Sequence, residues 1–298
     1  MTSSVLLRIR YEQERLSAAE RRVAAQILKD PHVVLRSTIM EMAARCDTSQ
    51  ATVARFCRAV GLDGYRALRV EVAAAASRQE AELDRFELAD GEIDPSDTAA
   101  EVVAKIAFQE TQAIVQTTDS LDLAALDAVV AAIVDSPSTD IYGFGSSALT
   151  ALDLQQKLHR IGMNAYAFSD IHLALPSAAI LKPMMVAIAV SHSGTTAEAN
   201  DALQRAHLAG AVTVAITNEP MSPLGRAADF VLATNAGENR YRSGAMSSRI
   251  AQLALVDALF VRIAQRRDYD ELVESLRLTY ESVRGHRVGK AQRGGSAR

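Results

Sequence analysis

Cysteines and long apolar runs are scarce in this chain of 298 residues. Its two cysteines, Cys46 and Cys57, are too few for a disulfide framework, and no second Cys or His pair stands near either at zinc-ligand spacing. No window reaches the roughly 18 uncharged apolar residues that a membrane helix needs, and the start MTSSVLLRIRYEQ has charges where a signal peptide needs an apolar core. We therefore expect a cytoplasmic protein with no metal site, no cofactor and no membrane partner.

Charge is distributed unevenly along the sequence. Hydrophobic residues make up 49% of the chain, which is enough for two domains with their own cores and excludes disorder of the whole. Residues 1–78 hold 13 Lys/Arg and 8 Asp/Glu, whereas residues 79–135 hold 2 and 14. A basic first module on a chain of net charge −4 suits a polyanion such as DNA, although a solvated basic face explains the charge alone equally well.

The N-terminal quarter has the pattern of a helix-turn-helix. A capping-box pair, Ser17 and Glu20, opens a first helical pattern of apolar residues. Two more such patterns follow, over residues 37–46 and 49–60, and the turn Asp47-Thr48 separates them. Two short helices joined by a tight turn, the second opening with polar residues, are typical of a DNA-binding motif.

The second helix of this motif would supply the DNA contacts. Such a helix places polar side chains in the major groove on the face opposite its core residues, which here are Val53, Phe56 and Cys57. Gln can address adenine, and Arg can address guanine or phosphate. Many helical hairpins share this spacing, so a plain helical domain is the alternative. The predicted DNA-binding residues are Ser49, Gln50, Thr52, Arg55 and Arg58.

Short apolar runs alternate with helical patterns from residue 140 onward, as a parallel sheet with crossover helices requires. The sequence predicts an all-α helix-turn-helix N-terminal domain followed by an α/β domain with a doubly wound five-stranded parallel sheet of strand order 2-1-3-4-5. The expected strands are Asp140–Phe144, Asn164–Phe168, Met184–Val190, Val212–Thr217 and Asp229–Ala233. The expected division is 1–77 for the DNA-binding domain, 78–98 for an acidic linker, 99–283 for the α/β domain and 284–298 for a basic disordered tail.

Two turns that follow strands carry the chemistry of the second domain. Gly143-Phe144-Gly145-Ser146-Ser147 follows the first strand, and Ser191-His192-Ser193-Gly194-Thr195-Thr196 follows the third. These strands are neighbours where the winding reverses, so both turns should line one crevice in which hydroxyls and helix N–H groups suit a single phosphate. Structural glycines without a ligand would explain only the first turn. A dinucleotide site stays open through Ala148 and Asp170, whereas the lack of Gly-Lys-Ser/Thr excludes a Walker loop.

These residues resemble the RpiR family of bacterial transcription regulators over nearly the full length of the chain. The first half is similar to the family's helix-turn-helix in Ala51–Cys57 and Gly61–Tyr65. The second half is similar to a sugar isomerase (SIS) domain in Gly143, Gly145 and Ser147, in Ser191, Ser193, Gly194 and Thr196, and in the segment Arg242–Leu253. Two motif sets in the expected order make the resemblance specific.

The resemblance implies a regulator whose SIS domain binds a phosphorylated sugar or sugar acid and changes the affinity of the first domain for operator DNA, controlling carbohydrate-metabolism genes. A homo-dimer or homo-tetramer would present paired recognition helices. The charged residues Glu238 and Arg242 could reach the effector, unless their loop is simply solvated. The predicted effector phosphate-binding residues are Gly145, Ser146, Ser147, Ser191, His192, Ser193, Gly194 and Thr196.

Catalysis is the main alternative. The same domain type performs aldose-ketose isomerisation of sugar phosphates, which needs a base beside the carbonyl carbon and an acid at the oxygen. The candidates near the two turns are His192, Glu198 and Glu238, and they form no evident acid/base pair. The attached DNA-binding module favours sensing, so we expect no enzymatic activity. A pure oligomerisation domain with vestigial phosphate turns is the second alternative.

Overall fold

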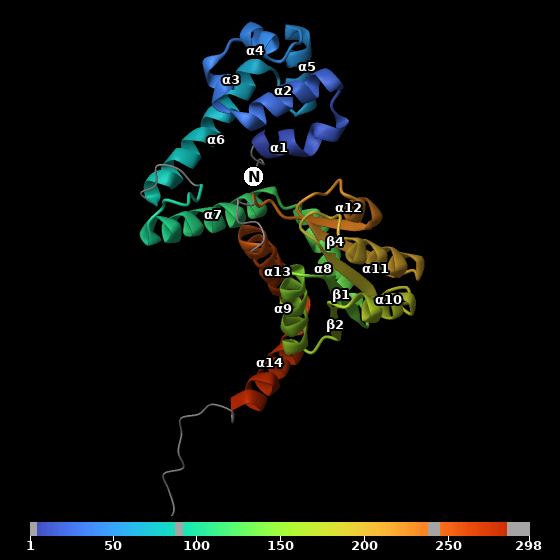
Figure 1. The fold of residues 1–298 in the computed structure, drawn as a ribbon. Coiled ribbons are helices and arrows are strands. Elements are labelled where there is room, and N and C mark those ends of the chain that lie inside the picture. Colours follow the sequence, from blue (N-terminus) through green and yellow to red (C-terminus); the bar gives the residue numbers. More distant parts are fainter. Residues whose placement is uncertain (1–4, 87–91, 238–244, 285–298) are drawn as a thin grey trace, which may run out of the picture.

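The computed structural model describes residues 5–86, 92–237 and 245–284. In Figure 1 the N-terminal helices form a bundle, and the long helix α6 leads from this bundle to the domain that contains the sheet. Glu238 and Arg242, predicted as further effector contacts, lie outside the described residues, as does almost all of the predicted basic tail.

The N-terminal bundle contains the predicted helix-turn-helix. Its apolar side chains, among them Ile9, Ile27 and Phe56, form one buried cluster. The capping box of Ser17 and Glu20 opens α2 as predicted. The helices are α1 (Val5–Glu12), α2 (Ala18–Lys29), α3 (His32–Arg36), α4 (Ile39–Arg45), α5 (Gln50–Ala59) and α6 (Tyr65–Arg85), with a short 3₁₀ turn at Gln13–Arg15.

Two features hold α4 and α5 in place. Thr38 caps α4 in a second capping box with Glu41, and Ser49 caps α5 by accepting a hydrogen bond from the backbone N–H of Thr52. Nε of Arg22 on α2 donates to the backbone oxygen of Cys46 over 2.9 Å, at the start of the turn between the two helices. The turn is therefore tied to a third helix, which fixes the angle at which α5 leaves it.

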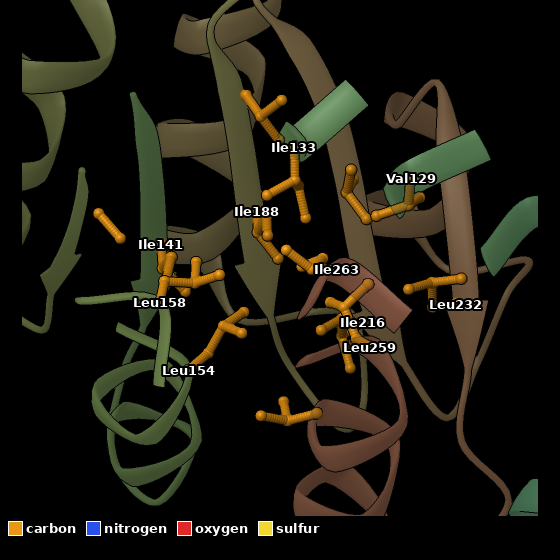
Figure 2. Close-up of a cluster of buried hydrophobic side chains, with 14 of the residues drawn as sticks. Val129, Ile133, Ile141, Leu154, Leu158, Ile188, Ile216, Leu232, Leu259 and Ile263 are labelled. Carbon is orange, nitrogen blue, oxygen red and sulfur yellow. The ribbon is translucent and has the colours of Figure 1, made fainter. Parts of the chain in front are cut away.

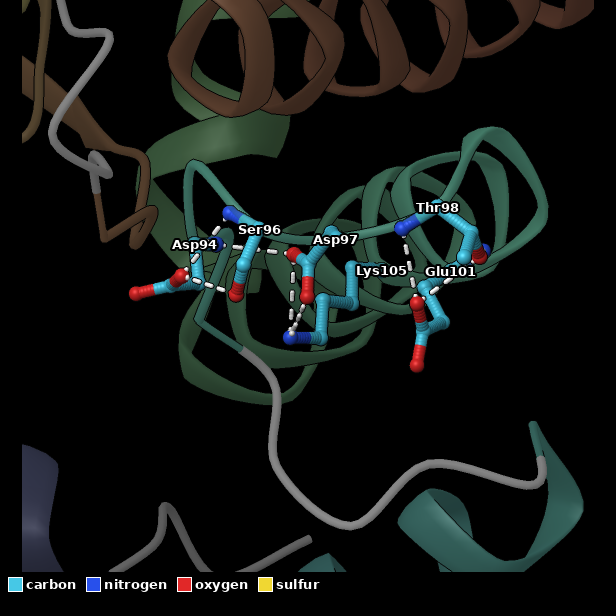
Figure 3. Close-up of polar contacts among 6 residues, drawn as sticks. All are labelled: Asp94, Ser96, Asp97, Thr98, Glu101 and Lys105. Carbon is cyan, nitrogen blue, oxygen red and sulfur yellow. Dashed lines mark hydrogen bonds and ion pairs between the residues drawn. The ribbon is translucent and has the colours of Figure 1, made fainter.

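Helix α6 continues to Arg85, so the first part of the segment predicted as a linker is helical. The rings of Phe86 and Phe108 meet edge to face with centroids 5.9 Å apart. Farther along the chain, a hydrogen-bonded turn at 94–98 leads into α7 (Ala99–Ser120), as Figure 3 shows. The segment between the domains thus packs on α7.

The second domain has five parallel strands in the predicted order β2-β1-β3-β4-β5. The predicted strand positions are confirmed to within two residues at each end. The strands are β1 (Thr139–Gly143), β2 (Ala165–Phe168), β3 (Val186–Val190), β4 (Val212–Thr217) and β5 (Phe230–Ala233). The crossover and flanking helices are α8 (Leu123–Asp135), α9 (Ser147–Arg160), α10 (Ile171–Ala179), α11 (Ala197–Leu208), α12 (Pro223–Ala227), α13 (Met246–Arg266) and α14 (Tyr269–Arg284).

Each face of the sheet has its own core, because side chains alternate along every strand. One face meets α8, α9 and α13 through large residues such as Ile188, Leu154 and Leu259, which Figure 2 shows interleaved. The other face meets α10 and α11 through small residues, including Ala187, Ala189 and Ala215. Alanines on both sides of this second contact let α11 lie close to the sheet and bring its first turn to the edge where β3 ends.

Candidate functional site

The two hydroxyl-rich turns lie side by side at one edge of the sheet. Strand β1 pairs in parallel with β3, and Gly143 at the end of β1 is opposite Val190 at the end of β3. A cavity of about 150 Å³, which we call the switch-point cavity, lies between the turns and the start of α13. From the predicted set it is lined by Ser146, Ser147, Ser191, His192, Ser193 and Thr196.

The turn after β3 is held together by its own hydroxyls. Ser191 is 2% exposed, its Oγ accepts a hydrogen bond from the backbone N–H of Gly194 over 3.2 Å, and it lies 3.0 Å from Oγ1 of Thr196. The backbone oxygen of His192 accepts from Oγ1 of Thr217 at the end of β4. Ser191 is therefore fixed before any ligand arrives, which reduces the entropy lost on binding.

The two predicted glycines shape the turns and do not line the cavity. Gly145 and Gly194 have φ of +58° and +62°, in the left-handed region that favours glycine. A Cβ added to Gly194 would lie 1.9 Å from Oγ of Ser222 and 2.4 Å from its Cβ, whereas nothing lies within 4 Å of the same position at Gly145. Of these two glycines, only Gly194 is thus closed to a larger residue by its neighbours.

Three helices begin at the cavity, and none has a side-chain cap within the described part of the chain. The N-cap residues are Ser146 for α9, Thr196 for α11 and Ala245 for α13. In contrast, α2, α4, α5, α7 and α8 are each capped by a Ser, Thr or Asp side chain. In α9 the first N–H groups, from Ser147 to Leu149, donate to backbone oxygens of the turn before it. The positive ends of the three helix dipoles nevertheless attract anions, so the cavity suits an oxyanion.

Helix α13 supplies cavity residues that were not predicted individually. Ser248, Arg249 and Gln252 line the cavity together with Ala245. They fall within the Arg242–Leu253 segment that resembles the family's last helix, yet the sequence alone could not show which face of that helix would turn toward the cavity. Oγ1 of Thr150 on α9 donates to Oε1 of Gln252 over 3.0 Å, and both side chains are buried.

The chemistry of the cavity bears on the alternatives of catalysis and dinucleotide binding. Glu198 is exposed in the first turn of α11 and does not line the cavity. No carboxylate lines the cavity among the described residues. The carboxylate of Asp170 caps α10 by accepting from the backbone N–H of His172 over 2.8 Å. A dinucleotide would need a far larger space than this cavity, since pockets for drug-sized ligands measure about 300–1,000 Å³.

Residues 5–86, 92–237 and 245–284 contain neither a metal-binding cluster nor a membrane-spanning helix. No group of three or more His, Cys, Asp or Glu side chains in these ranges is arranged to hold a metal ion. No helix in the same ranges is long and apolar enough to cross a membrane. Burial raises the pKa of Cys57 to about 11, and Cys46 is buried as well, so both belong to the helical core.

The predicted DNA-binding residues lie at α5, and four of them are exposed. Ser49, Gln50, Arg55 and Arg58 face solvent on this helix or at its cap. Thr52 is 5% exposed, so its placement on the outer face was wrong. The reason is the helical period, because Thr52 stands four residues before the buried Phe56 and shares its face.

Thr52 instead positions two of the exposed residues. Its Oγ1 lies 3.0 Å from Oγ of Ser49 and accepts a hydrogen bond from Nη2 of Arg55 over 2.9 Å. Nε of Arg55 is also 4.0 Å from a carboxylate oxygen of Glu20, and the Arg55 side chain remains 57% exposed. The guanidinium is thereby oriented while its outer edge stays open to a phosphate or a base.

The comparisons with known proteins agree with both halves of the chain. The helix-turn-helix domain of the rpiR family matches residues 3–79, and the SIS domain matches residues 132–262. An HTH-type transcriptional regulator of Caldanaerobacter subterraneus is 38% identical over 94% of this chain and 96% of its own length. The structure of Vibrio vulnificus NanR complexed with ManNAc-6P is similar with a TM-score of 0.59 and 28% identity, over 95% of this chain and 100% of that one.

A third comparison covers the second domain alone. The sugar isomerase domain of an RpiR transcription factor from Sphaerobacter thermophilus has a TM-score of 0.54 and 25% identity, over 61% of this chain and 99% of that one. A helix-turn-helix joined to a SIS domain defines a class of transcriptional regulator. The chain belongs to the rpiR family of such regulators.

Proposed function

We propose that this chain binds operator DNA through α5 and binds a phosphorylated sugar or sugar acid in the switch-point cavity, so that the ligand changes its affinity for DNA. The observation that carries the proposal is the cavity itself, where two hydroxyl-rich turns and three uncapped helix starts converge. A single phosphate satisfies both the hydroxyls and the helix N–H groups. The similar structure of NanR complexed with ManNAc-6P, a phosphorylated sugar, supports this ligand class.

Sensing is favoured over catalysis. Isomerisation needs a base and an acid on either side of the substrate carbonyl, and the described lining offers hydroxyls, an amide, a guanidinium and one imidazole. The relatives that match over nearly their full length are named as transcriptional regulators. Incubation of purified protein with sugar phosphates, followed by NMR of the products, should show no turnover, and isomerised product would contradict this part of the proposal.

The assembly is a homo-dimer or a homo-tetramer that places two copies of α5 on half-sites about one helical turn apart. Helix α14 supports this, because it extends away from the rest of the chain in Figure 1 and exposes large apolar side chains. These are Tyr269, Val273, Leu276, Leu278, Tyr280 and Val283. A second copy would cover a face of this kind, and light scattering of the full chain measures the number of copies.

The test of the function is a titration of the full chain on DNA from upstream of its own gene, followed by fluorescence anisotropy. At least one member of a panel of hexose, pentose, amino-sugar and sugar-acid phosphates should change the DNA affinity by about 5- to 150-fold, which is the usual range of allosteric coupling. The double variant Ser191→Ala, Ser193→Ala should still bind DNA and lose this response.

Thr118→Ala is the control, because it removes an exposed hydroxyl of α7 that does not line the cavity. A full response from the double serine variant would contradict the phosphate assignment. If no phosphate in the panel changes either DNA affinity or thermal stability, the vestigial alternative holds, because a ligand at 100 times its dissociation constant adds about 2.7 kcal/mol to stability.

A further inference from the structure

Two side chains on α13 line the switch-point cavity with N–H groups that have no acceptor among the residues that the structure describes. Gln252 is 2% exposed, and its Oε1 is already occupied by the hydroxyl of Thr150. Its Nε2 has no hydrogen-bond partner among the residues that the structure describes. An amide that is held through its oxygen offers only its N–H groups to the cavity, so a ligand at this position must present an acceptor.

Arg249 is the second donor. It lines the cavity, and within the described ranges it makes no ion pair and no hydrogen bond. By contrast, Arg262 on the same helix binds the carboxylate of Asp127 over 2.6 Å. A guanidinium stays charged at every physiological pH and presents paired N–H groups that match an oxyanion. The guanidinium of Arg249 is therefore available to bind an anionic group of a ligand.

These two donors are distinct from the phosphate site of the turns. A phosphate held by Ser191, Ser193 and Thr196 lies at the starts of α9 and α11, where hydroxyls and backbone N–H groups satisfy its oxygens. Arg249 and Gln252 are three residues apart, so they are neighbours on one face of α13. A planar group with two acceptor oxygens fits such a pair, since one oxygen takes the guanidinium and the other the amide.

The lining as a whole favours a ligand with two anionic groups. All the described side chains that line the cavity and carry polar atoms can donate hydrogen bonds, and none of them is a carboxylate. We propose that Arg249 and Gln252 bind a carboxylate of the effector, so that the effector is a phosphorylated sugar acid and not a neutral sugar phosphate. This inference rests on the proposed function, and it narrows the class of ligand for the same cavity.

The experiment compares matched ligand pairs on the full chain by calorimetry. The pairs are 6-phosphogluconate with glucose 6-phosphate and 5-phosphoribonate with ribose 5-phosphate, and gluconate and inorganic phosphate are single-group probes. In at least one pair the acid should bind more tightly by about tenfold or more, as expected of charge-assisted hydrogen bonds to a carboxylate. Arg249→Gln should remove this preference, because it should weaken the acid more than the aldose phosphate.

Two further variants separate the roles. Gln252→Glu keeps an acceptor for Thr150 and places a negative charge beside the carboxylate, so it should weaken the acid more than the aldose phosphate. Arg266→Gln, at an exposed position of the same helix, makes the same charge change away from the cavity and should bind like the wild type.

The outcomes also separate this inference from the function on which it rests. If Arg249→Gln weakens both members of each pair equally, Arg249 binds the phosphate and the carboxylate assignment is overturned while the sensor function stands. Aldose phosphates that bind the wild type as tightly as the acids would overturn the carboxylate assignment in the same way. If no phosphorylated ligand binds the wild type or changes its DNA affinity, the proposed function itself fails.

Discussion

Lys105 and Asp97 form an ion pair that is almost closed to solvent, at the point where the segment between the domains joins α7. Nζ of Lys105 lies 2.9 Å from Oδ1 of Asp97, and the two side chains are 7% and 9% exposed. The backbone N–H of Asp94 donates to the other carboxylate oxygen over 2.7 Å, as Figure 3 shows. The aspartate thus joins the turn at 94–98 to the second turn of α7.

Replacing one member of this pair should destabilise the protein more than replacing both. Lys105→Met leaves the Asp97 carboxylate enclosed without its cation, whereas Asp97→Asn with Lys105→Met leaves no charge to compensate. We expect a lower midpoint of thermal unfolding for Lys105→Met and a partial recovery for the double variant, measured by circular dichroism. A double variant that is no more stable than Lys105→Met would show that the charge pairing contributes nothing.

Asp97 should also contribute to the pH dependence of stability. The N–H of Asp94, followed by the ammonium of Lys105, holds the pKa of Asp97 below its ordinary value. A carboxyl with a lowered pKa in the folded state stabilises above its unfolded pKa of about 4, and the contribution is lost as the pH falls further. Asp97→Asn should therefore lose less stability than the wild type between about pH 4 and about pH 2. If the unfolding midpoints of the wild type and of Asp97→Asn change in parallel over this range, the lowered pKa of Asp97 is contradicted.

Replacement of Gly194 should destabilise the protein more than replacement of Gly145. Both residues have positive φ, so alanine at either position costs about 1–2 kcal/mol from the backbone alone. At Gly194 the new methyl also meets Ser222, whose Oγ caps α12 through the N–H of Gly225. Gly194→Ala should unfold at a lower urea concentration than Gly145→Ala and should lose the stabilisation by the effector. Equal effects of the two changes would mean that the turn can move away from Ser222.

Most of the fold could be predicted from the sequence because its signals are local. Alternation of apolar runs with helical patterns predicted five strands and their order, and capping residues such as Ser17 predicted where helices begin. The segments α1, α3 and α14 were not predicted as helices. Helices α1 and α3 span only 8 and 5 residues, which is too short for a helical period to stand out, and α14 leaves much of its apolar face exposed.

In the candidate sites, too, some residues could be predicted from the sequence and others could not. The two turns could be predicted, because a hydroxyl-rich loop directly after a buried strand is visible in the sequence. The contribution of Arg249 and Gln252 could not, since the packing of α13 against α7 and α9 decides which of its faces meets the cavity. Thr52 is a different case: its four-residue distance from Phe56 already indicated burial, and the apolar pattern of α5 should have included it.

The proposed DNA-binding face of α5 is expected to respond to the replacement of Thr52, a residue too buried to touch DNA. Thr52→Val keeps the shape of the buried side chain but removes the hydroxyl that holds Arg55 and Ser49. The affinity of this variant for operator DNA should therefore fall.

Arg58→Ala tests a phosphate contact by the same face. It should weaken DNA binding and reduce the slope of log affinity against log salt by about 0.9, the value for one phosphate contact. Arg160→Ala, at an exposed position of α9, is the control. An unchanged slope for Arg58→Ala would exclude a phosphate contact.

Asp140 on β1 should give stability a second pH dependence, of opposite sign to that of Asp97. Asp140 is 2% exposed and accepts hydrogen bonds from Oγ of Ser177 over 2.5 Å and from the hydroxyl of Tyr142 over 3.2 Å. Burial raises its pKa, and these two hydrogen bonds oppose the shift only in part. A carboxyl with a raised pKa stabilises the folded state while it is protonated, and that contribution is lost as the pH rises from the unfolded pKa of about 4 through the folded value.

Asp140→Asn removes this titration, so the free energy of unfolding of the variant relative to the wild type should increase as the pH rises from about 4 to about 7. The increase should be about 1.4 kcal/mol for each unit by which the folded state raises the pKa. Urea unfolding at several pH values measures it, and Asp135→Asn, which removes an exposed carboxylate at the end of α8, serves as the control. A constant difference between Asp140→Asn and the wild type would show that Asp140 titrates alike in the folded and unfolded chain.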